Sequence, residues 1–134
     1  MKERKKPETL RLRSLAPSLT ASDMQASLAF YRDVLGFVVR EAFEDQGKLQ
    51  GAILKAGSVE IYLSQDDFSK GRKRKKGQGF RLWCTTAQDL DQLAAGIEAR
   101  GGTLAEPVQT RPWGPRDFAV VDPDGFKLSF TTQM

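Results

Sequence analysis

Few side chains in this chain of 134 residues could do chemistry by the common routes. The sequence has no histidine and a single cysteine, Cys84. Catalysis by Ser/His/Asp or Cys/His groups, histidine-rich metal sites, a disulfide within one chain and a Cys-x-x-Cys cluster are therefore excluded. Two candidates remain: Glu60 as a general base, and Arg116 as a clamp for a carboxylate or phosphate.

Alternation along three expected strands collects several polar and aromatic side chains on one surface. Apolar residues at every second position suit a core, so the residues between them face the opposite side of the sheet. That side carries Glu60, Tyr62, Ser64, Arg81, Trp83, Lys127 and Ser129. Cys84 falls on the core side and is interpreted as a small buried hydrophobic residue.

Aromatic side chains could form the walls of a site for a flat or apolar ligand. The candidates are Tyr62, Trp83, Trp113 and Phe118. For each of them, ordinary packing at a seam of the fold or in a dimer interface is the alternative. Glu60 could act as a lone base or pair with Arg81, and we favour the pair because a buried carboxylate needs a cationic or donor partner. Arg116 could equally be an exposed hairpin residue.

Two helices are expected, at about 22–36 and 87–101, offset by about 65 positions. Apolar residues recur at helical spacing in both segments, and each ends at a glycine, Gly36 or Gly101. The pairs Ser22 with Gln25 and Thr85 with Gln88 match the capping-box pattern. The offset is close to half the chain and indicates an internal duplication.

Strand patterns flank each helix in the same order. The expected strands are 12–20, 37–43, 51–55 and 59–65 in the first half, and 80–85, 103–109, 118–121 and 126–131 in the second. Each half is then a β-α-β-β-β module. We expect one domain over 1–134, made of a basic tail (1–10), a first module (11–65), a basic linker (66–78) and a second module (79–134). Two such modules predict an α+β fold with an eight-stranded, cupped, mixed or antiparallel sheet whose concave face can bind a ligand.

Three segments carry a resemblance to a known family. They are Ser-Asp-Met-x-x-Ser-Leu-x-Phe-Tyr-x-x-Val-Leu-Gly-Phe at 22–37, Asp-Pro-Asp-Gly at 122–125, and Pro-Trp-Gly-Pro-Arg-Asp-Phe at 112–118. The chain resembles the vicinal-oxygen-chelate superfamily, the glyoxalase/bleomycin-resistance/dioxygenase group, over roughly 12–131, and its third segment is similar to the bleomycin-resistance-like branch. The resemblance implies the glyoxalase/bleomycin resistance/dihydroxybiphenyl dioxygenase-like fold and a homodimer.

Metal enzymes of that superfamily hold a divalent ion with four side chains, usually His, Gln or Glu. The matching positions here are Ala16, Glu60, Arg81 or Leu82, and Ser129. Glu60 alone among them is a strong ligand, and one carboxylate does not make a site for Zn²⁺ or Mg²⁺. We therefore expect no metal and no cofactor.

The net charge of +4 is unevenly distributed. Residues 2–6 carry +3 and residues 70–76 carry +6, which leaves about −5 for the remainder. Both basic segments are interpreted as solvated surface, with 1–8 disordered and 69–77 mobile, and we do not expect nucleic-acid binding. No apolar run is long enough for a signal peptide or a membrane span, so we expect a cytoplasmic protein.

Three functions stay open on the sequence alone. The first is a metal-free protein that sequesters or senses a small organic molecule on the concave sheet, using Glu60, Tyr62, Arg81, Trp83, Trp113, Arg116, Phe118 and Ser129. The second is a lyase, isomerase or dioxygenase of the superfamily with Glu60 as a base or partial metal ligand. The third is an interaction protein that uses its basic linker.

Overall fold

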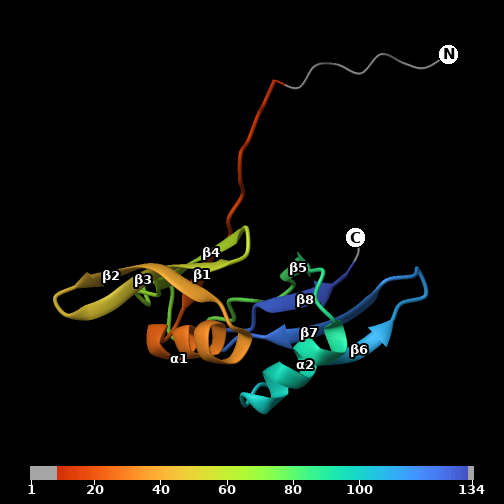
Figure 1. The fold of residues 1–134 in the computed structure, drawn as a ribbon. Coiled ribbons are helices and arrows are strands. Elements are labelled where there is room, and N and C mark those ends of the chain that lie inside the picture. Colours follow the sequence, from red (N-terminus) through yellow and green to blue (C-terminus); the bar gives the residue numbers. More distant parts are fainter. Residues whose placement is uncertain (1–8, 133–134) are drawn as a thin grey trace.

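The computed structural model describes residues 9–132, which form two modules of identical strand and helix order (Figure 1). The first module contains β1 (Ser18–Ala21), α1 (Met24–Leu28), η1 (Ala29–Leu35), β2 (Val38–Asp45), β3 (Lys48–Ala56) and β4 (Val59–Gln65). The second contains β5 (Arg81–Thr85), α2 (Leu90–Ala99), β6 (Glu106–Thr110), β7 (Arg116–Val121) and β8 (Lys127–Thr131). The predicted α+β fold of two β-α-β-β-β modules is confirmed. The predicted disorder of 1–8 concerns residues outside the described part.

The eight strands divide into two four-stranded mixed sheets. Their orders are β1-β4-β3-β2 and β5-β8-β7-β6, so the second sheet repeats the first. In each sheet the first and last strands of the module pair in parallel and the other neighbours pair antiparallel. Within residues 9–132 no ladder joins the two sheets, so the expected concave surface is divided between them.

Each helix covers one face of its own sheet, which leaves the other face open (Figure 1). Ile61 and Leu63 on β4 and Leu128 on β8 are buried toward the helices. We call the opposite faces the first open face, which carries Glu60, Tyr62 and Ser64, and the second open face, which carries Arg81, Trp83, Lys127 and Ser129. On β4 the burial of Ile61 and Leu63 matches the expected core side. On β5 Leu82 and Cys84, expected in the core, are only partly buried, and on β8 Ser129, expected on the open side, is fully buried.

The helix starts differ from the capping boxes expected. Asp23 caps α1 by accepting hydrogen bonds from the backbone N–H groups of Gln25 and Ala26, and Asp89 caps α2 by accepting from that of Gln92. The expected caps Ser22 and Thr85 are wrong. Ser22 instead donates its hydroxyl to Asp124, 102 residues away. The first helix continues as a π-helix, η1, and ends at Gly36, whose φ of 100° is in the left-handed region that glycine tolerates.

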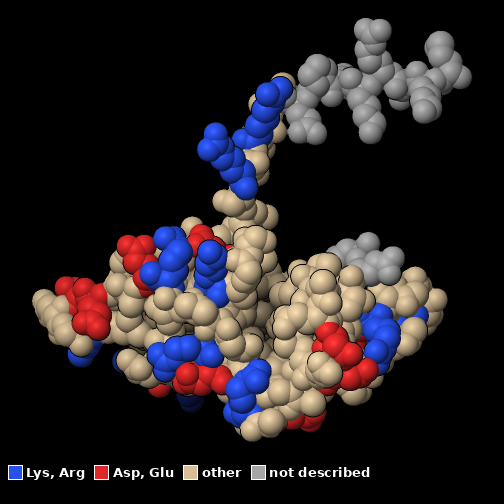
Figure 2. Space-filling model, in the orientation of Figure 1, with Lys and Arg blue, Asp and Glu red and all other residues tan. Residues whose placement is uncertain are grey.

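Residues 12–17, expected to be part of the first strand, lie outside β1. Pro17 has no backbone N–H to donate to a ladder, and β1 begins directly after it. The described segment 9–17 extends away from the body as an arm (Figure 1). Leu10, Leu12 and Leu15 expose 71%, 68% and 88% of their surface on this arm. On the face shown in Figure 2, the body carries basic and acidic side chains intermixed.

One buried and one exposed polar contact hold the two modules together. The Tyr31 hydroxyl on η1 donates to Asp122 of the second module at 2.8 Å, and both side chains are buried. Burial and the nearby Asp122 carboxylate raise the pKa of Tyr31, so that its hydroxyl stays a donor. Arg100 at the end of α2 donates to the Val34 carbonyl oxygen at 2.8 Å. These contacts fix the relative position of the modules and hence the space between them.

The basic linker is anchored at its carboxyl end. The Lys76 side chain is buried and lies 3.0 Å from Asp66 and 3.8 Å from Asp124. A Cβ on Gly77 would meet the Gly125 backbone at 2.1 Å, so only glycine fits there. Mobility stays a prediction for 69–75, but Lys76 and Gly77 pack against the body. No helix in the described part of the chain is long and apolar enough to span a bilayer.

Candidate ligand-binding site

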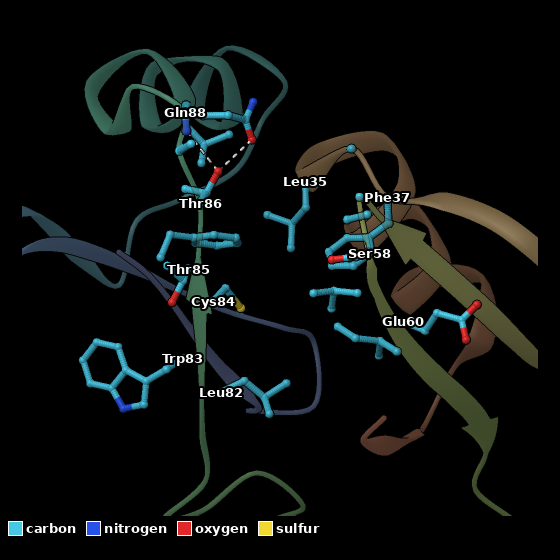
Figure 3. A pocket seen from close by; sticks show the side chains of 18 of the residues that line it. Leu35, Phe37, Ser58, Glu60, Leu82, Trp83, Cys84, Thr85, Thr86 and Gln88 are labelled. Carbon is cyan, nitrogen blue, oxygen red and sulfur yellow. Dashed lines mark hydrogen bonds between the residues drawn. The ribbon is translucent and has the colours of Figure 1, made fainter. Parts of the chain in front are cut away.

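A cleft of about 1210 Å³ lies between the two modules. One wall comes from the end of η1, the β3–β4 turn and β4, and the other from β5, the segment after it and α2. Figure 3 shows the two walls facing each other across this space. The volume is larger than that of most sites for drug-sized molecules.

The interior of the cleft is apolar. Leu35, Leu82 and the Cys84 thiol point into the space from opposite walls, and Phe37 lies beside Leu35 (Figure 3). Leu82 and Cys84 reach it because they alternate on β5 with the residues of the second open face. Burial raises the pKa of the Cys84 thiol to about 11, so at neutral pH the sulfur is a neutral wall atom rather than a thiolate nucleophile.

Polar groups border the cleft along one face of α2. Gln92 on α2 and Arg100, the residue that caps its end, lie on the same side as Gly96, because the three recur every four residues. Before the helix, the Thr86 hydroxyl accepts a hydrogen bond from the Gln88 backbone N–H and donates to its side-chain oxygen, at 3.1 and 3.2 Å (Figure 3). An apolar cavity with a few fixed polar groups at its edge suits an organic molecule that has both kinds of surface.

Glu60 borders the cleft, but its carboxylate points away from the centre (Figure 3). It forms an ion pair with Arg40, with Oε2 and Nε 2.5 Å apart. The expected partner, Arg81, is wrong: it pairs with Glu106 instead. Arg81 lies on β5 in the other sheet, whereas Arg40 lies on β2 in the same sheet as Glu60. A carboxylate held by a guanidinium is a poor candidate for a base in the cleft.

The residues at the superfamily's metal positions do not fit a metal ion. The Glu60 carboxylate is held in an ion pair by Arg40, and the side chains of Ala16 and Leu82 have no atom that can coordinate a metal. Ser129 is fully buried, and its hydroxyl has no hydrogen-bond partner. In the described residues no group of three or more His, Cys, Asp or Glu side chains is placed to hold an ion.

The second open face carries a cluster of charges centred on Glu106, which the sequence interpretation missed. Glu106 Oε2 accepts from Lys127 at 2.7 Å and from Arg81 at 2.9 Å, and Oε1 accepts from Arg111 at 2.6 Å. Arg111 also donates to the buried carboxylate of Asp117. The hydrogen bonds from Lys127 and Arg111 and the charge of Arg81 lower the pKa of Glu106 to about 2. Alternation had placed Arg81 and Lys127 on this face, but not Glu106.

The expected site residues fall into separate groups. Glu60 and Trp83 border the cleft, although the Trp83 ring points away from it (Figure 3). Arg81 belongs to the Glu106 cluster and lies over the Trp83 ring. Arg111 of the same cluster lies over the Trp113 ring. Tyr62 is on the first open face and partly exposed.

Two of the expected residues lie outside both places. Arg116 forms a two-pronged ion pair with Asp91 of α2, at 3.0 and 3.2 Å. Phe118 has no exposed surface, because its ring stacks on Phe130 on the helix side of the sheet. The expectation that Phe118 forms a ligand wall is therefore wrong: it shares its side of the sheet with core residues.

Comparison with known proteins gives a family and several relatives. The family described as Glyoxalase/Bleomycin resistance protein/Dioxygenase superfamily matches residues 12–130. The bleomycin resistance protein of Geobacillus stearothermophilus is 28% identical over 135 residues, covering 88% of this chain and 95% of that protein. A bleomycin resistance protein of Staphylococcus aureus (strain N315) gives the same values.

Solved structures share the fold at lower identity. TioX from Micromonospora sp. ML1 superposes with a TM-score of 0.74 at 21% identity, covering 90% of this chain and 98% of that one. A bleomycin resistance determinant encoded on transposon Tn5 gives 0.70 at 21% identity, with 91% and 98% covered. A bleomycin-binding protein complexed with bleomycin gives 0.65 at 21% identity, with 92% and 100% covered. At this identity, the likeness shows the fold.

Proposed function

Because the chain belongs to the Glyoxalase/Bleomycin resistance protein/Dioxygenase superfamily, we propose that it binds a small organic molecule in the cleft between its modules and thereby sequesters or senses it. The observation that carries the proposal is the cleft itself, with about 1210 Å³ of space between apolar walls and a polar edge. The curated relatives named for bleomycin resistance match 88% of this chain and support this class of function.

Binding in this site requires no metal. The one carboxylate at a superfamily ligand position, Glu60, points out of the cleft toward Arg40. The groups that line the cleft for recognition are apolar surfaces, the amides of Gln88 and Gln92, and the Arg100 guanidinium. Two carboxylates also line it, but Asp33 pairs with Arg32 and Asp89 caps α2. Such groups hold a ligand without changing it, which favours sequestration or sensing over a lyase or dioxygenase reaction.

The test is to fill the cleft. The thiol of Cys84 points into the space, so Cys84→Phe should occupy it, while Val38→Phe adds the same ring at an exposed position on β2 outside the cleft. Titration calorimetry with metal-free bleomycin and with 1-naphthylmethanol should show binding that weakens at least about tenfold in the first variant and is unchanged in the second. Unchanged affinity in folded Cys84→Phe protein, or no binding of either probe to the wild type, would overturn the proposal.

The protein acts as a homodimer in this proposal. The exposed leucines of the arm, Leu10, Leu12 and Leu15, support it, because a second copy would remove them from water. Light scattering at micromolar concentration should give about twice the chain mass of 14.9 kDa. A mass equal to that of one chain would contradict the dimer.

The cytoplasmic location also belongs to the proposal. A single cysteine with a neutral thiol is compatible with a reducing compartment. Cell fractionation with an antibody against the protein tests it, and recovery in the membrane or extracellular fraction would contradict it.

A further inference from the structure

The Glu106 cluster has more positive than negative charge. Three cations, Arg81, Arg111 and Lys127, surround one shared carboxylate, and Asp117 supplies the second. The cluster therefore carries one excess positive charge, on a body that is acidic outside its two basic segments. An anion that approaches this face meets attraction that the internal pairs do not cancel.

The cations keep unused donors that face solvent. The side chains of Arg81 and Lys127 are 32% and 28% exposed, and each donates to Glu106 through one nitrogen–oxygen contact. A guanidinium has five N–H donors and an ammonium has three. Both groups can therefore bind a second carboxylate while they keep Glu106.

Two exposed indole rings lie beside these cations. Trp83 is 41% exposed and lies 5.2 Å from the Arg81 guanidinium carbon, and Trp113 is 67% exposed and lies 5.6 Å from that of Arg111. Large aromatic surface left in water next to flat guanidinium groups is suited to stacking of a planar ring.

We propose that the second open face is a binding site for a planar aromatic carboxylate, whose ring stacks on Trp83 or Trp113 and whose carboxylate pairs with Arg81 and Lys127. The site goes beyond the proposed function, because the only residue it shares with the cleft is Trp83. The excess charge repels a ligand amine, so the site selects acids over bases of the same shape.

The chain's two tryptophans make the test specific, because each indole N–H gives one resolved NMR signal. The probes are 1-naphthoate, 1-naphthylmethanol and 1-naphthylmethylammonium, which share a ring and differ in charge. The indole signals are assigned with Trp83→Phe and Trp113→Phe. Naphthoate should shift the Trp113 signal, which lies outside the cleft, and titration of that signal should give about tenfold tighter binding than for the alcohol, with the ammonium weakest. Equal affinity of naphthoate and the alcohol would overturn the proposal.

Charge variants separate this site from general electrostatics. Lys127→Gln should weaken naphthoate about tenfold, Lys127→Arg should restore it, and neither should alter the alcohol. Arg116→Gln is the matched control, because it removes the same charge from the Asp91 pair outside this cluster. An equal loss in Arg116→Gln, or none in Lys127→Gln, would overturn the site. Indole shifts that follow protein rather than probe concentration would show instead an interface between copies.

Failure of this site is distinguishable from failure of the proposed function. If naphthoate shows no preference over the alcohol while Cys84→Phe still weakens bleomycin or alcohol binding, only the carboxylate site is wrong. If the cleft probes fail while the indole signals respond to naphthoate as expected, only the cleft proposal is wrong.

Discussion

On the first open face, Glu60 pairs with Arg40 alone and lies near Tyr62, whereas on the second, Glu106 is shared by three cations between two tryptophans. Both faces belong to sheets of the same strand order, and both sheets bury alternate apolar residues against their helices. The duplicated fold fixes the core side of each strand, because packing there tolerates little change. The open side is free to differ, and this is where the two modules acquire different chemistry.

The largest expected difference between the faces is in stability. Glu106→Gln leaves Arg81, Arg111 and Lys127 without their shared carboxylate and should lower the free energy of unfolding by about 2 kcal/mol. Glu60→Gln breaks one partly exposed pair and should cost less than about 1 kcal/mol. Urea unfolding at pH 7 measures both, and a loss in Glu60→Gln as large as that in Glu106→Gln would remove the distinction.

The same pair of variants gives a pH dependence. The folded-state pKa of Glu106 is lowered to about 2 from an ordinary value of 4.5, so its contribution is fully present above about 4.5 and is lost as the pH falls toward 2. The stability difference between wild type and Glu106→Gln should therefore shrink over this range. If the difference stays constant from pH 5 to pH 2.5, Glu106 is not held ionised by the three cations.

A smaller effect is expected from replacing one serine on each open face. Ser129 is buried with an unpartnered hydroxyl, whereas Ser64 is exposed. Ser129→Ala should be neutral or stabilising by up to about 1 kcal/mol, because it removes an unsatisfied polar atom, and Ser64→Ala should change nothing measurable. Thermal unfolding of the two variants checks this, and a clear destabilisation by Ser129→Ala would indicate that the hydroxyl has a partner in solution.

No change at all is expected from metal removal. Glu60 and Ser129, one from each open face, are the only oxygen-bearing side chains at the superfamily's metal positions, and neither is free to bind an ion. Dialysis against EDTA should leave the affinity for bleomycin and the stability as they were. The account would be contradicted if EDTA lowered the affinity tenfold, Zn²⁺ or Mg²⁺ restored it, and Glu60→Gln reproduced the loss. A metal-dependent mechanism would then be favoured.

The fold was predictable because its signals are local and repeated. The expected helices at 22–36 and 87–101 contain the observed 24–35 and 90–99, and the strand at 59–65 has the predicted bounds. The caps were wrong because Ser22 and Asp23 are adjacent and both can cap, and the Asp124 contact that engages Ser22 is distant in sequence. The observed first strand is shorter than expected because Pro17, which has no backbone N–H for a ladder, directly precedes it.

The candidate site was less predictable because it depends on contacts across strands. Alternation places Glu60 on the first open face, but its pairing with Arg40 instead of Arg81 follows from the division into two sheets, which no local pattern shows. The Glu106 cluster combines side chains from β5, β6 and β8 with Arg111, which directly follows β6. These strands are brought together by the strand order of the sheet, which the sequence pattern does not give. The cleft itself results from how the modules pack, with Tyr31 and Asp122 at their contact.

The most direct test of ligand binding in the cleft is to locate a bound molecule by intermolecular nuclear Overhauser effects. With selectively methyl-labelled protein in the presence of EDTA, metal-free bleomycin and 1-naphthylmethanol should both give contacts to the methyl groups of Leu35, Leu82 and Leu93, which line the cleft. The methyl groups of Val38, exposed on β2 outside the cleft, serve as the reference. Contacts to the three leucines and not to Val38 are the predicted result. Bound probe with contacts only outside the cleft would contradict the account.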